Sequence, residues 1–158
     1  MQEILNATKG KYHITTDLRR IDLEMVHHYL CYESYWSRGI PLEKVETAAW
    51  NSLNFGLFHA ENQIGYARVI TDYSQIAYLG DVFILEAYRG FGLGKWLIET
   101  VHSHPQLQNL RNWLLGTKDA QGLYQQFGWI NPPEPYRWMI RPNREVYRGN
   151  EGWEHPGV

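Results

Sequence analysis

One stretch of the sequence, residues 81–98, constrains the fold of this chain more than any other. An apolar run typical of a β-strand ends there in a glycine-rich loop, and apolar residues then resume at helical spacing. Gly90, Gly92 and Gly94 lack Cβ atoms, so the backbone can turn sharply and approach a ligand closely. The first N–H groups of the following helix have no partners within the helix. A strand, a glycine loop and a helix in this order predict a binding site for a phosphate or pyrophosphate.

The spacing of the glycines excludes two common phosphate-binding loops. A Walker A loop has four residues before its Gly-Lys pair and then Ser or Thr, whereas Gly90 and Gly94 enclose three residues and Trp96 follows the lysine. A dinucleotide-binding loop has the spacing Gly-x-Gly-x-x-Gly, which would require a glycine at Lys95 or Leu97. The glycines could still form a phosphate-binding loop of another kind, or a strand-to-helix turn that binds no ligand.

The N-terminal part of the chain predicts one short strand and two helices. Residues 11–15 alternate as a strand, and apolar residues at helical spacing predict a helix over 22–31 with Asp22 as its cap. Pro41 suits the first turn of a second helix that extends to about residue 54. The segment between the two helices, residues 32–39, is aromatic but contains Ser and Gly, and we expect a loop that contacts a ligand.

The middle of the chain predicts a meander of antiparallel strands. Residues 55–59 and 64–70 form a hairpin pattern, and residues 76–85 follow after a polar break. This third strand leads directly into the glycine loop.

The last part predicts a crossover and a closing pair of strands. A helix over 93–102 followed by a strand over 112–116 makes that strand a parallel neighbour of residues 76–85. A short helix over 119–127 and final strands at 129–130 and 136–141 complete the prediction. The chain is therefore expected to have an α/β fold with a mixed sheet.

Composition limits the number of domains and the classes of partner. With 158 residues, 44% of them hydrophobic, the chain suits one domain, expected over 1–142, followed by a polar tail at 143–158. The formal net charge is -2 with scattered Lys and Arg, so no nucleic-acid surface is predicted. No stretch has the ~18 apolar residues of a membrane helix and the start lacks a leader pattern, so we expect no membrane partner and a cytoplasmic protein.

Cysteine and histidine content argues against a metal site. Cys31 is the one cysteine, which excludes an internal disulfide and a cysteine zinc set. The histidine pairs at 27–28 and at 102 and 104 are expected to be exposed or capping residues rather than metal ligands.

Two motifs resemble those of the GCN5-related N-acetyltransferase (GNAT) superfamily. The segment from Arg89 to Gly94 fits Arg/Gln-x-x-Gly-x-Gly/Ala between an apolar strand and a helix. Residues 117–129 are similar to the second family motif, Asn-x-x-Ala-x-x-Leu-Tyr-x-x-x-Gly-Phe. The resemblance covers about residues 64–140. It implies a GNAT-like fold, in which an antiparallel meander leads into a splayed pair of parallel strands flanked by helices.

The resemblance also implies acetyl-CoA as co-substrate. In this family the pantetheine arm enters the gap between the splayed strands and hydrogen-bonds to the backbone of the strand before the loop. Carried over by position, Phe83, Ile84 and Leu85 would make these contacts. The pyrophosphate would be held by Arg89, Gly90, Phe91, Gly92, Leu93, Gly94 and Lys95. Thr117 stands where the family often has an asparagine, which puts a side-chain contact to pantetheine there in doubt.

Tyr124, in the second motif, is the candidate catalytic acid. When an amine attacks a thioester, sulfur leaves as a thiolate, and a phenol of pKa about 10 can donate a hydrogen bond or proton to this sulfur, whose thiol has a pKa of about 8.5, as the charge forms. The resemblance implies this role for Tyr124, which is also a candidate contact for the co-substrate. Asp81 is the candidate base for the amine. Asp72, Glu33, His59 and ordered water are the alternatives to Asp81.

Aromatic residues indicate where an acceptor could bind. The sequence has 7 Trp and 11 Tyr, which either fill a core or line a pocket for a cationic ligand. The candidate substrate-binding residues are Tyr32, Glu33 and Trp36 between the first two helices, and Tyr73 in the turn before the third strand of the meander. An acid among aromatics favours a cationic, partly apolar amine.

The function predicted from the sequence is transfer of acetyl from acetyl-CoA to a primary amine, by direct attack in a ternary complex. A small-molecule amine is favoured as acceptor, and a protein N-terminus or lysine is the alternative. A CoA-binding regulatory or interaction module without turnover and a site for a nucleotide or phosphate ester are further alternatives. The oligomeric state is left open, with a homodimer among the options.

Overall fold

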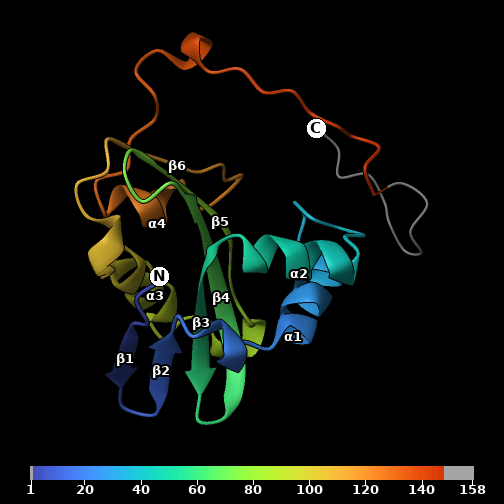
Figure 1. Cartoon of the computed structure of the whole chain (residues 1–158), viewed down its shortest axis with the longest axis vertical. Helices are drawn as coiled ribbons and strands as arrows, with labels where there is room; N and C mark the ends of the chain where they lie inside the picture. Colours follow the sequence, from blue (N-terminus) through green and yellow to red (C-terminus); the bar gives the residue numbers. More distant parts are fainter. Residues whose placement is uncertain (1, 148–158) are drawn as a thin grey trace.

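The computed structural model of the chain describes residues 2–147 and contains one six-stranded mixed sheet in the order β1-β2-β3-β4-β5-β6 (Figure 1). Neighbours from β1 to β5 are antiparallel, and β6 is parallel to β5. The strands are β1 (Asn6–Lys9), β2 (Tyr12–Thr15), β3 (Leu53–His59), β4 (Asn62–Thr71), β5 (Ile76–Ile84) and β6 (Asn112–Leu114).

Helices lie on both faces of this sheet, with α1 and α2 on one face and α3 and α4 on the other (Figure 1). The α-helices are α1 (Leu23–His28), α2 (Leu42–Trp50), α3 (Leu93–Ser103) and α4 (Gln121–Gln125). Tyr29–Glu33, labelled η2, continues α1 as a π-helical turn. Short 3-10 helices, labelled η1 and η3 to η5, occupy Leu18–Arg20, Glu86–Tyr88, Pro105–Leu107 and Pro135–Arg137.

Each face of the sheet has its own hydrophobic cluster. On the α3 side, Leu97, Ile98 and Val101 are fully buried against strand residues such as Phe55. On the α1 side, a smaller cluster joins both N-terminal helices to the aromatic side chains of β4 and β5, and it includes Val26, Tyr29, Val45, Tyr66 and Phe83. The sheet is therefore buried on both faces along its central strands.

The predicted parallel pair is confirmed, and its strands part early. Pairing between β5 and β6 begins at Ile76 with Asn112 and ends at Tyr78 with Leu114. Beyond this point β5 runs on to Ile84 without β6. The expected splayed geometry follows, since the two strands share hydrogen bonds only at one end.

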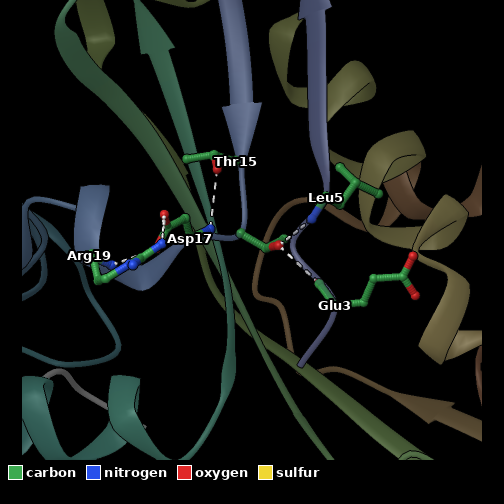
Figure 2. A network of polar contacts seen from close by, with 6 residues as sticks. Glu3, Leu5, Thr15, Asp17 and Arg19 are labelled. Carbon is green, nitrogen blue, oxygen red and sulfur yellow. Dashed lines mark hydrogen bonds and ion pairs between the residues drawn. The ribbon is translucent and has the colours of Figure 1, made fainter. Parts of the chain in front are cut away.

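The polar network at the start of the chain ties β1 to the turn after β2 (Figure 2). The Thr16 hydroxyl accepts a hydrogen bond from the N–H of Leu5 at 2.8 Å and donates one to the Glu3 carbonyl at 3.5 Å. Asp17 caps the following turn by accepting from the N–H of Arg19. These bonds fix the N-terminal hairpin, whose first strand the sequence pattern did not predict because its residues are polar and do not alternate.

The predicted strands at 129–130 and 136–141 are wrong for this structure. Pro132, Pro133 and Pro135 lack backbone N–H donors and break the segment between the two predicted strands, and residues 138–141 pair with no strand among residues 2–147. A 3-10 helix at Pro135–Arg137 is the one regular element there. The predicted helix over 41–54 is also shorter, because Leu53 and the residue after it belong to β3.

Part of the predicted polar tail packs against the body. Tyr147 is half-buried beside the cluster on the α1 side. Residues 148–158 of the predicted tail lie outside the described residues. No helix within residues 2–147 is long and apolar enough to cross a membrane.

Two histidines near the end of α3, the half-buried His102 and the fully buried His104, are expected to make the stability of the fold pH-dependent. His104 is fully buried, its Nδ1 accepts from the N–H of Gln106 and its Nε2 lies 3.1 Å from the Glu3 carbonyl, so the ring is neutral. Burial lowers the pKa of His104, and it also lowers the pKa of His102, whose Nε2 accepts from Trp129. A lowered pKa in the folded state means that stability present above about pH 6.5 is lost as pH falls.

We expect the free energy of unfolding to decrease as the pH falls from 7 to 5, measured by urea denaturation. His104→Gln should lower stability at pH 7 and flatten this slope, because the residue that must be neutral is gone. His28→Gln, at an exposed position, serves as the control and should keep the wild-type slope. An unchanged slope in His104→Gln would contradict the argument.

Candidate active site

The glycine loop forms an open cradle at the N-terminus of α3. Gly90 and Gly92 have φ values of 84° and 77°, in the left-handed region that favours glycine. No side chain caps the helix, and its first hydrogen bond runs from the N–H of Trp96 to the Gly92 carbonyl. A Cβ atom built at Gly94 would meet nothing within 4 Å. The first N–H groups of α3 therefore face open space that suits a pyrophosphate.

A cavity of about 610 Å³ connects this cradle to the gap beside β5. Its lining comes from the glycine loop, the end of β5, the η2 turn with the loop after it, and α4. Tyr124 and Trp36 both line it. The cavity thus joins the two segments that carry the sequence motifs.

The end of β5 offers backbone groups to this cavity. The N–H of Leu85 donates to the Ile64 carbonyl on β4 at 2.8 Å, so this amide is already paired. Because successive residues of a strand point their polar groups to opposite edges, the groups of Ile84 and Val82 face away from β4. The open edge belongs to Val82 and Ile84, and Val82 was not among the residues predicted from the motif.

Arg89 turns back toward the sheet instead of pointing out of the loop. Its Nε donates to the Ile84 carbonyl at 2.9 Å, and its Nη2 donates to the Tyr29 hydroxyl at 3.0 Å. The Tyr29 ring stacks on Phe83 with centroids 3.8 Å apart. Burial raises the pKa of Tyr29, and the positive charge of Arg89 opposes this shift. Arg89 thus joins η2 to β5 at the edge of the cavity.

Tyr124 is buried on α4 with its hydroxyl free of hydrogen bonds to other residues in 2–147. Burial raises the pKa of Tyr124 to about 12, and the nearby Tyr35 adds to the shift. The phenol is therefore protonated at neutral pH and can donate. Tyr35 itself accepts from the N–H of Lys118 at 2.8 Å and bridges the two loops over the cavity.

Thr117 has a local structural role. Its Oγ1 accepts from the N–H of Ala120 at 3.1 Å and caps the turn into α4. The hydroxyl only accepts in this hydrogen bond, so a contact from Thr117 to pantetheine stays a prediction.

Asp81 lies at a β-bulge and is fully paired. Ala67 on β4 opposes two residues of β5 there, and Asp81 has a φ of 52°. One carboxylate oxygen accepts from Arg68 Nε at 2.8 Å, and the other accepts from Trp36 Nε1 at 3.0 Å. Both side chains of the ion pair are largely buried. The two donors hold the carboxylate in one orientation, with one of them on each oxygen.

The structure also shows where the three alternative bases, Asp72, His59 and Glu33, lie relative to the cavity. Asp72 accepts from three backbone N–H groups of its own turn, and these bonds lower its pKa. The His59 ring packs on Tyr12 and Tyr88 and does not line the large cavity. Glu33 lines that cavity and is exposed, so it is the one alternative acid that the fold brings to the site.

The predicted acceptor residues divide into two groups. Trp36 and Glu33 line the cavity. Tyr32 lies outside it and packs on the rings of His27 and His28. Tyr73 also lies outside it, and its hydroxyl accepts from Gln2 at 3.0 Å at the far turn of the sheet.

A second cavity of about 540 Å³ lies beside Asp81. Its floor carries Asp81 and Arg68, and α1 and α2 form its walls. Tyr147 closes one side. Sequence reasoning missed Arg68 and Tyr147, since neither lies in a motif. Residues 2–147 hold no group of three or more His, Cys, Asp or Glu side chains that could bind a metal.

This chain is similar in sequence to proteins that are named as acetyltransferases. Residues 53–131 match the family model described as an acetyltransferase (GNAT) domain. A protein of Gibberella zeae named as an acetyltransferase is 27% identical over 139 residues, which cover 75% of this chain and 78% of that protein. A protein of Gracilaria tenuistipitata var. liui named as an uncharacterized N-acetyltransferase is 31% identical over 117 residues, covering 70% of this chain and 64% of the relative.

A solved structure extends the similarity over the fold. The crystal structure of an acetyltransferase of the GNAT family from Xanthomonas campestris pv. campestris is 40% identical to this chain. It superimposes with a TM-score of 0.85 over 89% of this chain and 99% of that one.

Proposed function

Because the chain belongs to the GNAT family of acetyltransferases, we propose that it takes the acetyl group from acetyl-CoA and transfers it to a primary amine of a small molecule. The observation that carries the proposal is a single cavity that joins the open N-terminus of α3 to the hydroxyl of Tyr124. Acetyl-CoA needs an anion site at one end and a sulfur site at the other, and the cavity offers a candidate for each in the glycine loop and Tyr124.

The residues of the cradle fit the co-substrate. The pyrophosphate would accept hydrogen bonds from the first N–H groups of α3, in the space that the glycines leave open. The amides of pantetheine would pair with the free edge of β5 at Val82 and Ile84, as an added strand does. The Ile84 carbonyl is held by Arg89, so pantetheine would share or replace that hydrogen bond.

Transfer then requires one bond to form and one to break. The amine nitrogen attacks the thioester carbonyl in a ternary complex, the C–N bond forms, the nitrogen loses its extra proton to water, and the C–S bond breaks to leave a thiolate. Tyr124 donates a hydrogen bond to this thiolate. Full proton transfer from a phenol of pKa about 12 to the thiolate of a thiol of pKa ~8.5 is uphill by about 5 kcal/mol, so Tyr124 acts mainly as a hydrogen-bond donor.

The second cavity supports a small amine as the acceptor. Its volume of about 540 Å³ falls in the range of small-molecule sites. Asp81 would hold the ammonium form near the boundary with the first cavity, and Tyr66 and Tyr147 supply aromatic walls. The amine would lose its proton to water before attack, since both oxygens of Asp81 are engaged.

A screen of amines with acetyl-CoA, following release of free thiol, tests this function. We expect release that depends on the amine, with small cationic amines better than peptides bearing a free N-terminus or lysine. Binding of acetyl-CoA without release by any amine would favour the CoA-binding module. Faster thiol release with peptides than with small amines would indicate that the acceptor is a protein.

Asp81→Asn should weaken binding of the amine while leaving acetyl-CoA binding unchanged. Asn tolerates the left-handed backbone and can still accept from Trp36, but it lacks the charge that holds an ammonium group. Hydrogen bonds to charged groups contribute about 1.5–3 kcal/mol, so KM for the best amine should rise about 10-fold or more. Glu43→Gln, at the exposed rim of the same cavity, is the matched control. An unchanged KM in Asp81→Asn would limit Asp81 to a structural role.

A further inference from the structure

Arg68 has hydrogen-bond donors that the fold does not use. Its Nε donates to Asp81 at 2.8 Å and its Nη1 donates to the Ser52 hydroxyl at 3.0 Å, whereas its Nη2 has no hydrogen-bond partner among residues 2–147. Every fully buried side-chain nitrogen or oxygen in this part of the chain has a partner, so Nη2 is accessible to solvent. The Arg68 side chain is only 16% exposed and lines the second cavity, which is the space open to Nη2.

The second cavity therefore presents opposite charges side by side. Asp81 carries the negative charge, Arg68 carries the positive one, and both line the cavity. A ligand with an ammonium and a carboxylate group on one carbon atom matches this pair. A plain amine would pair with Asp81 but leave the free donors of Arg68 without an acceptor. A phosphate carries up to two negative charges, so Asp81 would repel it more strongly than a carboxylate.

Most of the remaining wall of this cavity is apolar or aromatic. The charged residues Glu43 and Lys44 are exposed at its rim on α2. The aliphatic side chains come from α1, α2 and the segments next to them, and the rings of two tyrosines complete the wall: Val26, Leu30, Ile40, Val45, Ala48, Tyr66 and Tyr147. Such a wall suits an apolar or aromatic side chain of the ligand.

We propose that the acceptor is a free α-amino acid with an apolar side chain, whose carboxylate binds Nη2 of Arg68 and whose ammonium group binds Asp81. This inference rests on the proposed function and narrows the small amine to one chemical class. The hydrogen bond between Asp81 and Trp36 links the two cavities, because Asp81 lines the second and Trp36 lines the first. The amino group at Asp81 is thus on the path to the thioester, and the product is an N-acetyl amino acid.

Recognition of the carboxylate also gives a reason for excluding proteins as acceptors. The carboxyl group of the first residue of a peptide is part of an amide, so it has no negative charge to offer Arg68. The side-chain amine of a lysine within a protein has no carboxylate beside it. Both kinds of protein amine lack one half of the charge pair that the second cavity matches.

Thiol release with matched pairs of acceptors tests the class of substrate. L-phenylalanine is compared with phenethylamine, and L-leucine with isopentylamine. At pH 7 the members of each pair carry the same ammonium group and differ in the carboxylate. We expect KM to be at least about 10-fold lower for the amino acid of a pair. Calorimetric titration of the same compounds in the presence of CoA gives their affinities without turnover.

Two outcomes of this comparison are distinct. Release of thiol with the plain amines at an equal or lower KM would overturn the inference and leave acetyl transfer to small amines intact. Absence of release with every amine would overturn the proposed function and this inference with it.

Arg68→Gln separates recognition of the carboxylate from support of the fold. It should raise KM for L-phenylalanine at least about 10-fold and leave KM for phenethylamine unchanged or lower, because Asp81 keeps its charge. An equal change for both acceptors would limit Arg68 to a structural role and overturn the inference. Arg68→Lys keeps the positive charge beside Asp81 and serves as the second variant should Arg68→Gln fail to fold. It lacks the planar fork, so it should also lose part of the preference.

Two further variants control for charge alone. Arg111→Gln makes the same chemical change at an exposed position outside both cavities and should keep both KM values. Lys44→Gln removes the positive charge at the rim of the second cavity. Loss of the preference for L-phenylalanine in Lys44→Gln, with the preference kept in Arg68→Gln, would place the carboxylate at the rim and contradict the assignment to Arg68.

Discussion

Tyr124→Phe is expected to slow acetyl transfer by about 10² to 10⁴ while acetyl-CoA binds as before. We propose that the Tyr124 hydroxyl donates to the departing sulfur, and within residues 2–147 it makes no hydrogen bond to another residue. Its removal leaves the ring to pack against Trp129 as in the wild type, so the fold should be preserved. Steady-state thiol release with the best amine gives kcat, and calorimetric titration gives the affinity for acetyl-CoA.

The control for this variant is Tyr12→Phe, on β2 and away from the cavity. It makes the same chemical change and should leave kcat unchanged. A kcat in Tyr124→Phe within 2-fold of the wild type would remove Tyr124 from the mechanism.

Gly94→Asp is expected to abolish acetyl-CoA binding without unfolding the protein. Gly94 is the second residue of α3, where an acidic side chain stabilises a helix by about 0.3–1 kcal/mol. The same carboxylate would stand in the cradle and repel the pyrophosphate by up to about 4 kcal/mol per charge pair at 4 Å. We expect the affinity to fall by at least 10²-fold, measured by calorimetric titration.

Gly122→Asp provides a control with the same substitution at the same position of another helix. Gly122 is the second residue of α4, it is exposed, and a Cβ atom there meets nothing within 4 Å. It lies outside the cavity that joins the cradle to Tyr124. Normal acetyl-CoA affinity in Gly94→Asp, with Gly122→Asp also normal, would place the pyrophosphate elsewhere.

Local patterns predicted the central part of the fold well. The glycine spacing and the strand-helix-strand order are properties of short segments, and they led to the cradle at α3 and to the parallel pair β5 and β6. The alternation of residues 55–85 predicted the meander for the same reason.

The remaining features depend on contacts between distant residues. Arg89 meets Tyr29 across 60 positions, and Trp36 meets Asp81 across 45. Neither contact leaves a periodic signal, so Asp81 was expected as a base and is found paired with Arg68. Residues 136–141 have the alternation of a strand, but alternation does not supply the neighbour that a strand needs.

The central claim is that the cavity between α3 and Tyr124 holds acetyl-CoA, and a thermal-shift comparison of acetyl-CoA with ATP and NAD tests it most directly. Acetyl-CoA at 100 times its Kd should stabilise the protein by about 2.7 kcal/mol, and ATP and NAD at the same concentration should leave the melting temperature unchanged. Stabilisation by ATP or NAD without stabilisation by acetyl-CoA would contradict the account.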